Sequence, residues 1–295
     1  MNLIKKINPE QLREYVETHP HLVHTSKSVK YPGLQVIKYT RSAFWDGAWD
    51  PILVELRGLV VDEDYNVISR PFRKVFNRNE PNGGLLPEDF DRDEEVTAYR
   101  KINGFMAAVT FSPKHGGVIV STTGTTDSDY AKLASKYVIE AIEDGYQPRF
   151  GITDIFEVCD PSDRHIIPEE TDLYYLGSRN KHTGTLSLHN VDTEGFICRW
   201  GDLVKEVKNV RHEGFVAYNK DGLCIKLKSP YYLVNKFFAR MKAKKFETGL
   251  RTGTLKQTID EEFYPLVDYL EANKESFLAM DEQERLNFTR NFLEK

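Results

Sequence analysis

The sequence has few cysteines and no long apolar run. Its three cysteines lie far apart, at Cys159, Cys198 and Cys224. Such spacing favours neither a disulfide framework nor a cysteine-based zinc site, so we expect buried, reduced thiols. No apolar run approaches the roughly 20 residues of a membrane-spanning helix. The first residues, MNLIKK, lack the apolar core of a secretory signal. These absences predict a cytoplasmic protein without a membrane partner.

A strong net charge and a compact metal motif are also missing. The 295 residues carry a formal charge of −5, which argues against a generic nucleic-acid coat. His19, His21 and His24 lie close together and are the nearest approach to a metal-binding cluster. They fall in a predicted loop after a helix, so we do not expect a metal there.

The charge is unevenly distributed near the C-terminal end. Residues 226–257 carry nine basic side chains and one acid, whereas the residues from 258 onward carry ten acids and four bases. A basic segment beside an acidic one is typical of a polyanion-binding surface. A solvated helix face over residues 236–256 explains the pattern equally well.

The hydrophobic pattern predicts an α+β chain. Asn8 is a good N-cap and Pro9 a good first residue for a helix that ends near Thr18. Residues 127–144 repeat apolar side chains with a helical period, and Gly145 follows. Runs of β-branched and aliphatic residues predict strands elsewhere. These strands cover residues 52–61, 67–69, 96–101, 105–111, 117–122, 153–159, 173–176, 194–199, 213–218 and 223–228.

Glycine and proline predict how some of these strands pair. Residues 96–122 form a candidate antiparallel meander, and residues 219–222 form a hairpin turn. The last 65 residues have helical patterns only, and one of their helices is capped by Asp281 with Glu284. We therefore predict antiparallel sheets flanked by helices over residues 1–229. A small all-α appendage follows over residues 230–295.

Lys101 opens the tetrapeptide Lys101-Ile102-Asn103-Gly104 at a predicted strand end. A lysine amine is a nucleophile only when it is deprotonated, and burial or a neighbouring cation lowers its pKa. Gly104 would let a ligand approach the backbone closely. Taken alone, the tetrapeptide is better explained as a surface lysine before a turn.

Lys226 and Lys228 are separated by one residue in a predicted strand, so both point to the same face. Two neighbouring cations repel each other unless an anion is present. A triphosphate would supply one, and the two cations would also depress the pKa of Lys101. The alternative is an exposed edge strand whose lysines prevent aggregation.

Two glutamates and one arginine add to this pattern. Glu157 lies in an apolar strand, and Glu213 opens the hairpin whose other arm carries the lysines. Carboxylates are hard ligands suited to magnesium beside phosphates, although either could be an ordinary ion-pair partner. Arg57 lies in a predicted strand, where a buried cation needs an anion such as phosphate.

In order and spacing, these motifs together resemble the covalent nucleotidyltransferases. Within that superfamily the chain is similar to the ATP-dependent RNA ligases typified by the tRNA-repair ligase of T-even phages. The resemblance covers roughly residues 50–230. The motifs that carry it are Leu56-Arg57-Gly58, Ser69 to Asn77, Lys101 to Gly104, Phe156-Glu157, Glu213-Gly214-Phe215 and Ile225 to Lys228.

The resemblance implies a ligase-type nucleotidyltransferase fold and a three-step reaction. Lys101 would attack the α-phosphate of ATP, the adenylate would pass to an RNA 5′-phosphate, and a 3′-hydroxyl would displace AMP. It implies Mg²⁺, or Mn²⁺, as the metal. We expect a monomer in the cytoplasm, which would be that of the host cell if a phage encodes the chain. The implied catalytic residues are Lys101, Lys226 and Lys228. Lys226 and Lys228 would also bind the nucleotide, together with Arg57, Lys74, Asn103, Gly104, Glu157 and Glu213. The two glutamates would serve the ribose and the metal.

The sequence departs from the family at two positions. Asn103 stands where the family nearly always has Asp, so a charge near Lys101 is lost. Thr123 precedes Gly124 where the family often has lysine, which removes one expected phosphate contact. These changes motivate the alternative of a nucleotide- or RNA-binding protein that kept the fold and lost catalysis. A second alternative keeps the lysyl-adenylate but transfers it to DNA ends or a capping acceptor.

Overall fold

The structure is a computed structural model that describes residues 3–163, 165–189, 191–240 and 243–293; the side chains of residues 240, 243 and 244 also lie outside the description. The chain forms two compact units. Unit 1 comprises the chain up to Phe76, Pro81–Glu88 and Ile102–Glu194. Unit 2 comprises Asn77–Glu80, Asp89–Lys101 and the chain from Gly195 onward. The chain therefore passes from one unit to the other inside the tetrapeptide that Lys101 opens.

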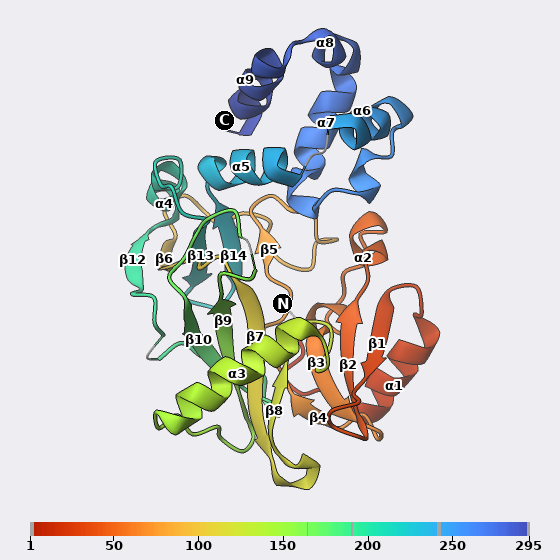
Figure 1. Ribbon diagram of the computed structural model, residues 1–295, viewed down its shortest axis with the longest axis vertical. Coiled ribbons are helices and arrows are strands. Elements are labelled where there is room, and N and C mark those ends of the chain that lie inside the picture. Colours follow the sequence, from red (N-terminus) through yellow and green to blue (C-terminus); the bar gives the residue numbers. More distant parts are fainter. Residues whose placement is uncertain (1–2, 164, 190, 241–242, 294–295) are drawn as a thin grey trace. The chain divides into compact units, whose positions relative to one another are not determined.

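Unit 1 begins with an antiparallel sheet that is covered by a helix (Figure 1). Asn8 caps the first helix, because its Oδ1 accepts hydrogen bonds from the Glu10 and Gln11 amides at 2.9 and 3.2 Å. Leu12 and Tyr15 of this helix pack on the sheet. The elements are α1 (Pro9–Thr18), β1 (Val23–Lys27), β2 (Leu34–Tyr39), α2 (Ser42–Trp45), β3 (Arg57–Asp62) and β4 (Val67–Ser69), with strand order β1-β2-β3-β4.

The second sheet of unit 1 is also antiparallel, with strand order β11-β10-β9-β7-β8. Helix α3 lies along one face of it, where Ala134 and Val138 pack against Phe156 and Val158 (Figure 1). The elements are β7 (Phe105–Ser112), β8 (Gly117–Ser121), α3 (Asp129–Glu143), β9 (Ile152–Cys159), β10 (Asp172–Asn180) and β11 (Leu186–Ser187).

Unit 2 contains the third antiparallel sheet, in the order β12-β6-β13-β14-β5. Trp200 and Leu203 of helix α4 pack on one of its faces, against Phe215, Ile225 and Leu227. Because side chains alternate along a strand, Lys226 and Lys228 lie on the other face. The elements are β5 (Phe76–Asn77), β6 (Glu95–Arg100), β12 (Phe196–Arg199), α4 (Trp200–Glu206), β13 (Gly214–Asn219) and β14 (Cys224–Lys228).

The end of unit 2 is helical and has a hydrophobic core of its own, which includes Phe237, Phe263, Leu266 and Phe277. The predicted all-α appendage is therefore present. Among the described residues, no helix has both the length and the apolar character to cross a membrane. The helices are α5 (Pro230–Arg240), α6 (Ala243–Thr252), α7 (Tyr264–Ala272), α8 (Lys274–Ala279) and α9 (Glu282–Leu293).

Two local predictions were wrong. Residues 52–61 do not form one strand, because a 3-10 turn at Leu53–Glu55 precedes β3. The Asp50 carboxylate accepts hydrogen bonds from the Ile52 and Leu53 amides, and this local bonding competes with an extended backbone. The predicted meander over residues 96–122 is also split. β7 and β8 form a hairpin, but β6 pairs with β12 and β13 in another sheet.

Candidate active site

Lys101 follows β6 directly and is fixed at its backbone. Its amide donates to the carbonyl of Gly214 at 2.9 Å, which continues the pairing of β6 with β13. Its Nζ lies 3.1 Å from Glu213 Oε2, and its side chain is 21% exposed, so solvent and ligands still have access. The sheet therefore presents a lysine amine beside a buried carboxylate.

Lys228 faces the same glutamate from the other arm of the hairpin. Its Nζ lies 3.6 Å from Glu213 Oε1, so this carboxylate lies between two ammonium groups. The close approach requires Gly214, which has a φ of +134° and is paired directly with Lys228. A Cβ at this glycine would lie 2.9 Å from the Lys228 Cα and would overlap the Leu227 carbonyl oxygen. The motif glycine therefore sets the spacing of the charged groups.

Sequence reasoning missed the partner that completes this cluster. Glu262, in the 3-10 turn Glu261–Phe263, forms ion pairs with Lys228 and, at 2.6 Å, with Lys236 of α5. Lys236 is also 2.8 Å from Asp260. Only the position of Glu262 in the acidic segment pointed toward it, since no spacing rule links residue 262 to a strand ending at 228.

Neighbouring charges favour the ionised forms of Glu262 and Lys228. Burial alone would raise the pKa of Glu262, but Lys228 and Lys236 outweigh it and lower the pKa from 4.5 to about 2. Burial would likewise lower the pKa of Lys228, yet Glu262 and Glu213 raise it above its ordinary value. Burial, followed by the Glu213 charge, raises the pKa of Tyr232, whose ring lies 5.2 Å from the Lys228 Nζ.

The rest of the tetrapeptide belongs to unit 1. The Gly104 amide donates to Glu157 Oε1 at 3.1 Å. A Cβ at Gly104 would lie 2.9 Å from Glu157 Cγ and would overlap the Val158 carbonyl oxygen, so only glycine fits against β9 here. Asn103 is buried, and among the described residues no acceptor lies within hydrogen-bonding distance of its Nδ2.

Arg57 opens β3 and reaches the second sheet of unit 1. Its Nη1 lies 3.1 Å from the Met106 sulfur. Met106 is directly opposite Glu157 in the pairing of β7 with β9, so Arg57, Met106 and Glu157 lie on one face. Three predicted residues of unit 1 are thus close to this face: Arg57, Gly104 and Glu157.

Lys74 is placed differently from the other predicted residues. It is 2% exposed, and its Nζ lies over the rings of Phe44, Phe76 and Trp49 at 4.5, 5.0 and 5.5 Å from their centroids. Aromatic faces stabilise a desolvated cation, so the three rings explain how the buried Lys74 can keep its charge. A contact between Lys74 and a nucleotide stays a prediction.

The sequence also matches a known family over most of its length. The family model described as RNA ligase matches residues 55–246, a range that contains all the predicted site residues. The chain belongs to the RNA ligase family. The resemblance stated from the motifs is therefore confirmed. The matched range ends before Glu262.

Solved structures of ligases share the fold. An archaeal ATP-dependent RNA ligase is 11% identical, with a TM-score of 0.56 over 97% of this chain and 76% of its own. A putative ATP-dependent DNA ligase from Aquifex aeolicus is 12% identical, with a TM-score of 0.54 over 97% of this chain and 77% of its own. These likenesses confirm the predicted α+β ligase-type fold. The comparison with curated proteins gives no significant match.

Glu157 and Glu213 are the two carboxylates of this RNA ligase that were predicted to serve a divalent cation. Among the described residues, no three His, Cys, Asp or Glu side chains are grouped to hold a metal ion. Glu157 accepts a hydrogen bond from Gly104, and Glu213 is paired with Lys101 and Lys228. Each carboxylate by itself fits a hard cation whose remaining ligands are phosphate oxygens and waters.

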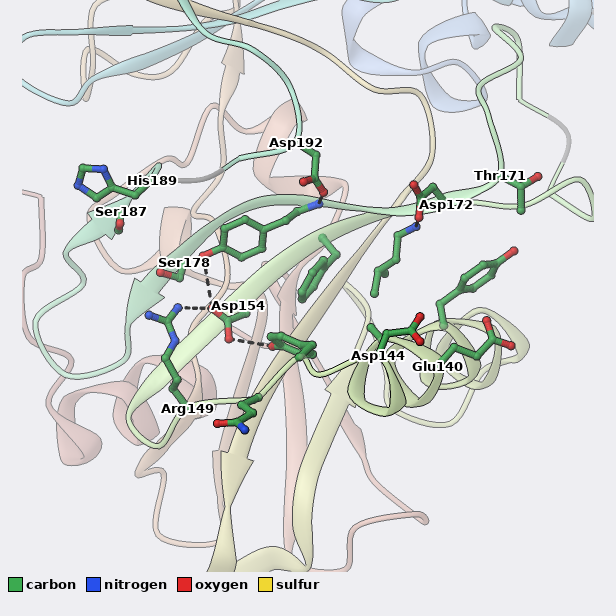
Figure 2. Close-up of a pocket in the computed structure, with 17 residues that line it drawn as sticks. Glu140, Asp144, Arg149, Asp154, Thr171, Asp172, Ser178, Ser187, His189 and Asp192 are labelled. Carbon is green, nitrogen blue, oxygen red and sulfur yellow. Dashed lines mark hydrogen bonds and ion pairs between the residues drawn. The ribbon is translucent and has the colours of Figure 1, made fainter.

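A separate pocket of the RNA ligase lies beside α3 in unit 1 and has a volume of about 710 Å³ (Figure 2). At its centre, Asp154 is bonded to Arg149, Tyr146 and Tyr175. Asp154 and Phe156 line it, whereas Glu157, the next residue in β9, points to the opposite face. Its other carboxylates, from Glu140, Asp144, Asp172 and Asp192, make it unsuited to a phosphate.

Proposed function

We propose that this chain is an ATP-dependent RNA ligase that joins RNA 5′-phosphate and 3′-hydroxyl ends through a lysyl-AMP on Lys101. The observation that carries the proposal is the position of Lys101 beside Glu213, in a cluster that also contains Lys228. A nucleophilic lysine needs a proton acceptor and nearby charge to stabilise the leaving group. Family membership supplies the reaction class.

In the first step, the neutral Lys101 amine attacks the α-phosphorus of ATP. A phosphorus–nitrogen bond forms, the bond between the α-phosphorus and the bridging oxygen breaks, and pyrophosphate leaves. Lys226, on the same face of β14 as Lys228, contacts the α-phosphate, and Lys228 supports it. A bound divalent cation, Mg²⁺ or Mn²⁺, would neutralise charge on the phosphates, and Glu157 and Glu213 are its candidate ligands.

In the second step, an RNA 5′-phosphate oxygen attacks the same phosphorus and the phosphorus–nitrogen bond breaks. The leaving nitrogen takes up the proton that it lost in the first step, so Lys101 regains its amine. In the third step, a 3′-hydroxyl attacks the RNA phosphate, a phosphodiester bond forms, and AMP leaves. Arg57 and Lys74 bind nucleotide or phosphate groups, and Asn103 and Gly104 contact the nucleotide. Residues 1–229 form the adenylation domain and residues 230–295 form a helical domain.

The proposal is tested by incubating the protein with α-labelled ATP and Mg²⁺ and mapping the AMP adduct by mass spectrometry. We expect one labelled peptide that contains Lys101, and no label on a Lys101→Ala protein. Lys220→Ala, which changes an exposed lysine in the β13–β14 turn, is the matched control and should label normally. Equal labelling of Lys101→Ala and wild-type protein would disprove the assignment.

The runner-up is a nucleotide- or RNA-binding protein without catalysis, which Asn103 and Thr123 favour. It predicts ATP or RNA binding without any adduct. Transfer to DNA ends is distinguished by competition, because an RNA ligase converts 5′-phosphorylated RNA in preference to the DNA of the same sequence.

A further inference from the structure

Lys38 and Arg57 are neighbouring cations in unit 1. Lys38 of β2 is directly opposite Arg57 of β3 in the antiparallel register, so both side chains are on one face. Both residues are partly buried. Among the described residues, no carboxylate is within ion-pair distance of either one, and the Arg57 Nη1 lies 3.1 Å from the Met106 sulfur. Like charges placed directly opposite destabilise a sheet unless an anion lies between them.

The turn after β8 lies against this pair. A Cβ at Gly58, next to Arg57, would lie 2.9 Å from both the Thr122 carbonyl oxygen and the Thr123 Cα. A Cβ at Gly124 would lie 3.2 Å from the Nζ of Lys38. The Thr122 amide closes the turn by donating to the Thr125 carbonyl at 2.9 Å. The Lys38 ammonium therefore lies beside Gly124, a residue of the turn that has no side chain.

The Lys38–Arg57 pair lies next to the turn that contains Thr123. Thr123, beside Gly124, is the position at which the chain lacks a lysine of the family. The Lys38 ammonium comes from another strand and reaches the glycine that follows this position. The turn thus has a cation beside it that comes from a residue 85 positions before Thr123 in the chain.

We propose that Lys38 and Arg57 form a phosphate-binding site over the Thr122–Thr125 turn, with Lys38 taking the place of the lysine that is absent at position 123. This inference rests on the proposed function for its ligand, which is a phosphate group of ATP or the 5′-phosphate of RNA. Arg57 offers two parallel donors to one phosphate, and Lys38 adds a compact charge from the neighbouring strand.

The test uses Lys38→Met, which removes the charge and keeps most of the side-chain length. ATP with Mg²⁺ is titrated into a Lys101→Ala protein with and without the Lys38 change, so that binding is measured without chemistry. A second arm titrates 5′-phosphorylated RNA against the same RNA with a 5′-hydroxyl. Lys27→Met, at an exposed lysine of β1 in the same sheet, is the matched control.

We expect Lys38→Met to weaken either ATP or 5′-phosphorylated RNA about tenfold or more, and the affected arm identifies the phosphate. Lys27→Met should stay within twofold of the parent protein. The melting temperature of Lys38→Met should be unchanged or higher, because a repulsive neighbour of Arg57 is gone. Adding Thr123→Lys to Lys38→Met should restore binding, which a merely structural lysine would not predict.

The inference is overturned if Lys38→Met binds both ligands within twofold of the parent protein, or if Lys27→Met weakens binding as much. If Lys38→Met melts well below the parent protein, the lysine is structural and the inference also fails. Because these titrations need no adenylate, they remain informative when wild-type protein forms none. That result would remove the proposed ligase activity and leave the phosphate site to be decided by binding.

Discussion

Glu262 links the helical end of unit 2 to the β14 strand, and its removal should have a measurable cost. The side chains of Glu262, Lys228 and Lys236 are 5, 10 and 8% exposed. Glu262→Gln keeps the shape but leaves two buried ammonium groups with less compensation. Breaking a buried ion pair by changing one partner costs about 3–5 kcal/mol. The pKa of Glu262, lowered from 4.5 to about 2, gives about 3 kcal/mol by linkage.

The pH dependence has a definite sign. The folded pKa of Glu262 lies below its unfolded value, so its contribution is fully present above about pH 4.5 and is lost as the pH falls toward 2. The difference in the free energy of unfolding between wild type and Glu262→Gln should therefore be about 3 kcal/mol at pH 7. Linkage puts it below half of that value at pH 3.

Urea unfolding at a series of pH values, followed by circular dichroism, measures this difference. Glu275→Gln, at an exposed glutamate of α8, is the control, and a change within about 0.5 kcal/mol is expected for it. A pH-independent difference between wild type and Glu262→Gln would refute the ion-pair explanation. A difference under about 1 kcal/mol at pH 7 would show that desolvation offsets the pairing.

Three further predictions concern other positions. Asn103→Ala should change the melting temperature little, because the buried Nδ2 has no acceptor among the described residues, yet it should slow lysyl-AMP formation at least tenfold if this amide contacts the nucleotide. Gly214→Ala should abolish adenylation and lower stability, since a Cβ overlaps the Leu227 carbonyl, whereas Gly222→Ala in the open turn, with a φ of +72°, should lower stability only mildly in the same melting assay. Glu55→Gln should destabilise the protein by about 3 kcal/mol in thermal melts, because Glu55 is buried between Arg70 at 3.0 Å and Arg179 at 2.8 Å.

Local signals in the sequence predicted much of the fold. The Asn8 cap and Pro9 gave the first helix at Pro9–Thr18, and the turn at residues 219–222 gave the hairpin of β13 and β14. The capping pair of Asp281 and Glu284 is present, with reciprocal bonds at 2.8 and 2.9 Å. Each of these features depends on residues within about four positions of one another, so the sequence contains all of the relevant chemistry.

Sheet membership was harder to predict, because it depends on contacts between distant residues. Strand β6 looks like the start of a meander with β7, but it pairs with β12 and β13, which lie more than 90 residues later. The same limit applied to the candidate site. The motif order predicted Lys101, Glu213 and Lys228 as site residues, and both lysines lie beside Glu213 in the structure. The contacts of Glu262 and Lys38 depend on partners that no local pattern specifies.

The structure explains part of the charge pattern at residues 226–295, where a basic segment is followed by an acidic one. A basic segment followed by an acidic one was compatible with a polyanion surface or with a solvated helix face. The structure adds a third explanation, in which the segments neutralise each other. Lys236 pairs with Asp260 and Glu262, and Lys256 lies 2.5 Å from Asp268.

Burial and pairing with Glu262 remove Lys228 and Lys236 from any RNA-binding surface, whereas the Lys256 side chain is 37% exposed. Lys245 and Arg251 are exposed and remain candidates for contact with RNA, while the side chains of Arg240, Lys242 and Lys244 lie outside the described residues. An exposed cation contributes to RNA affinity through counterion release, whereas a buried, paired one does not. Replacing Lys245 and Arg251 should therefore reduce the salt dependence of RNA binding, and replacing Lys236 should leave it unchanged.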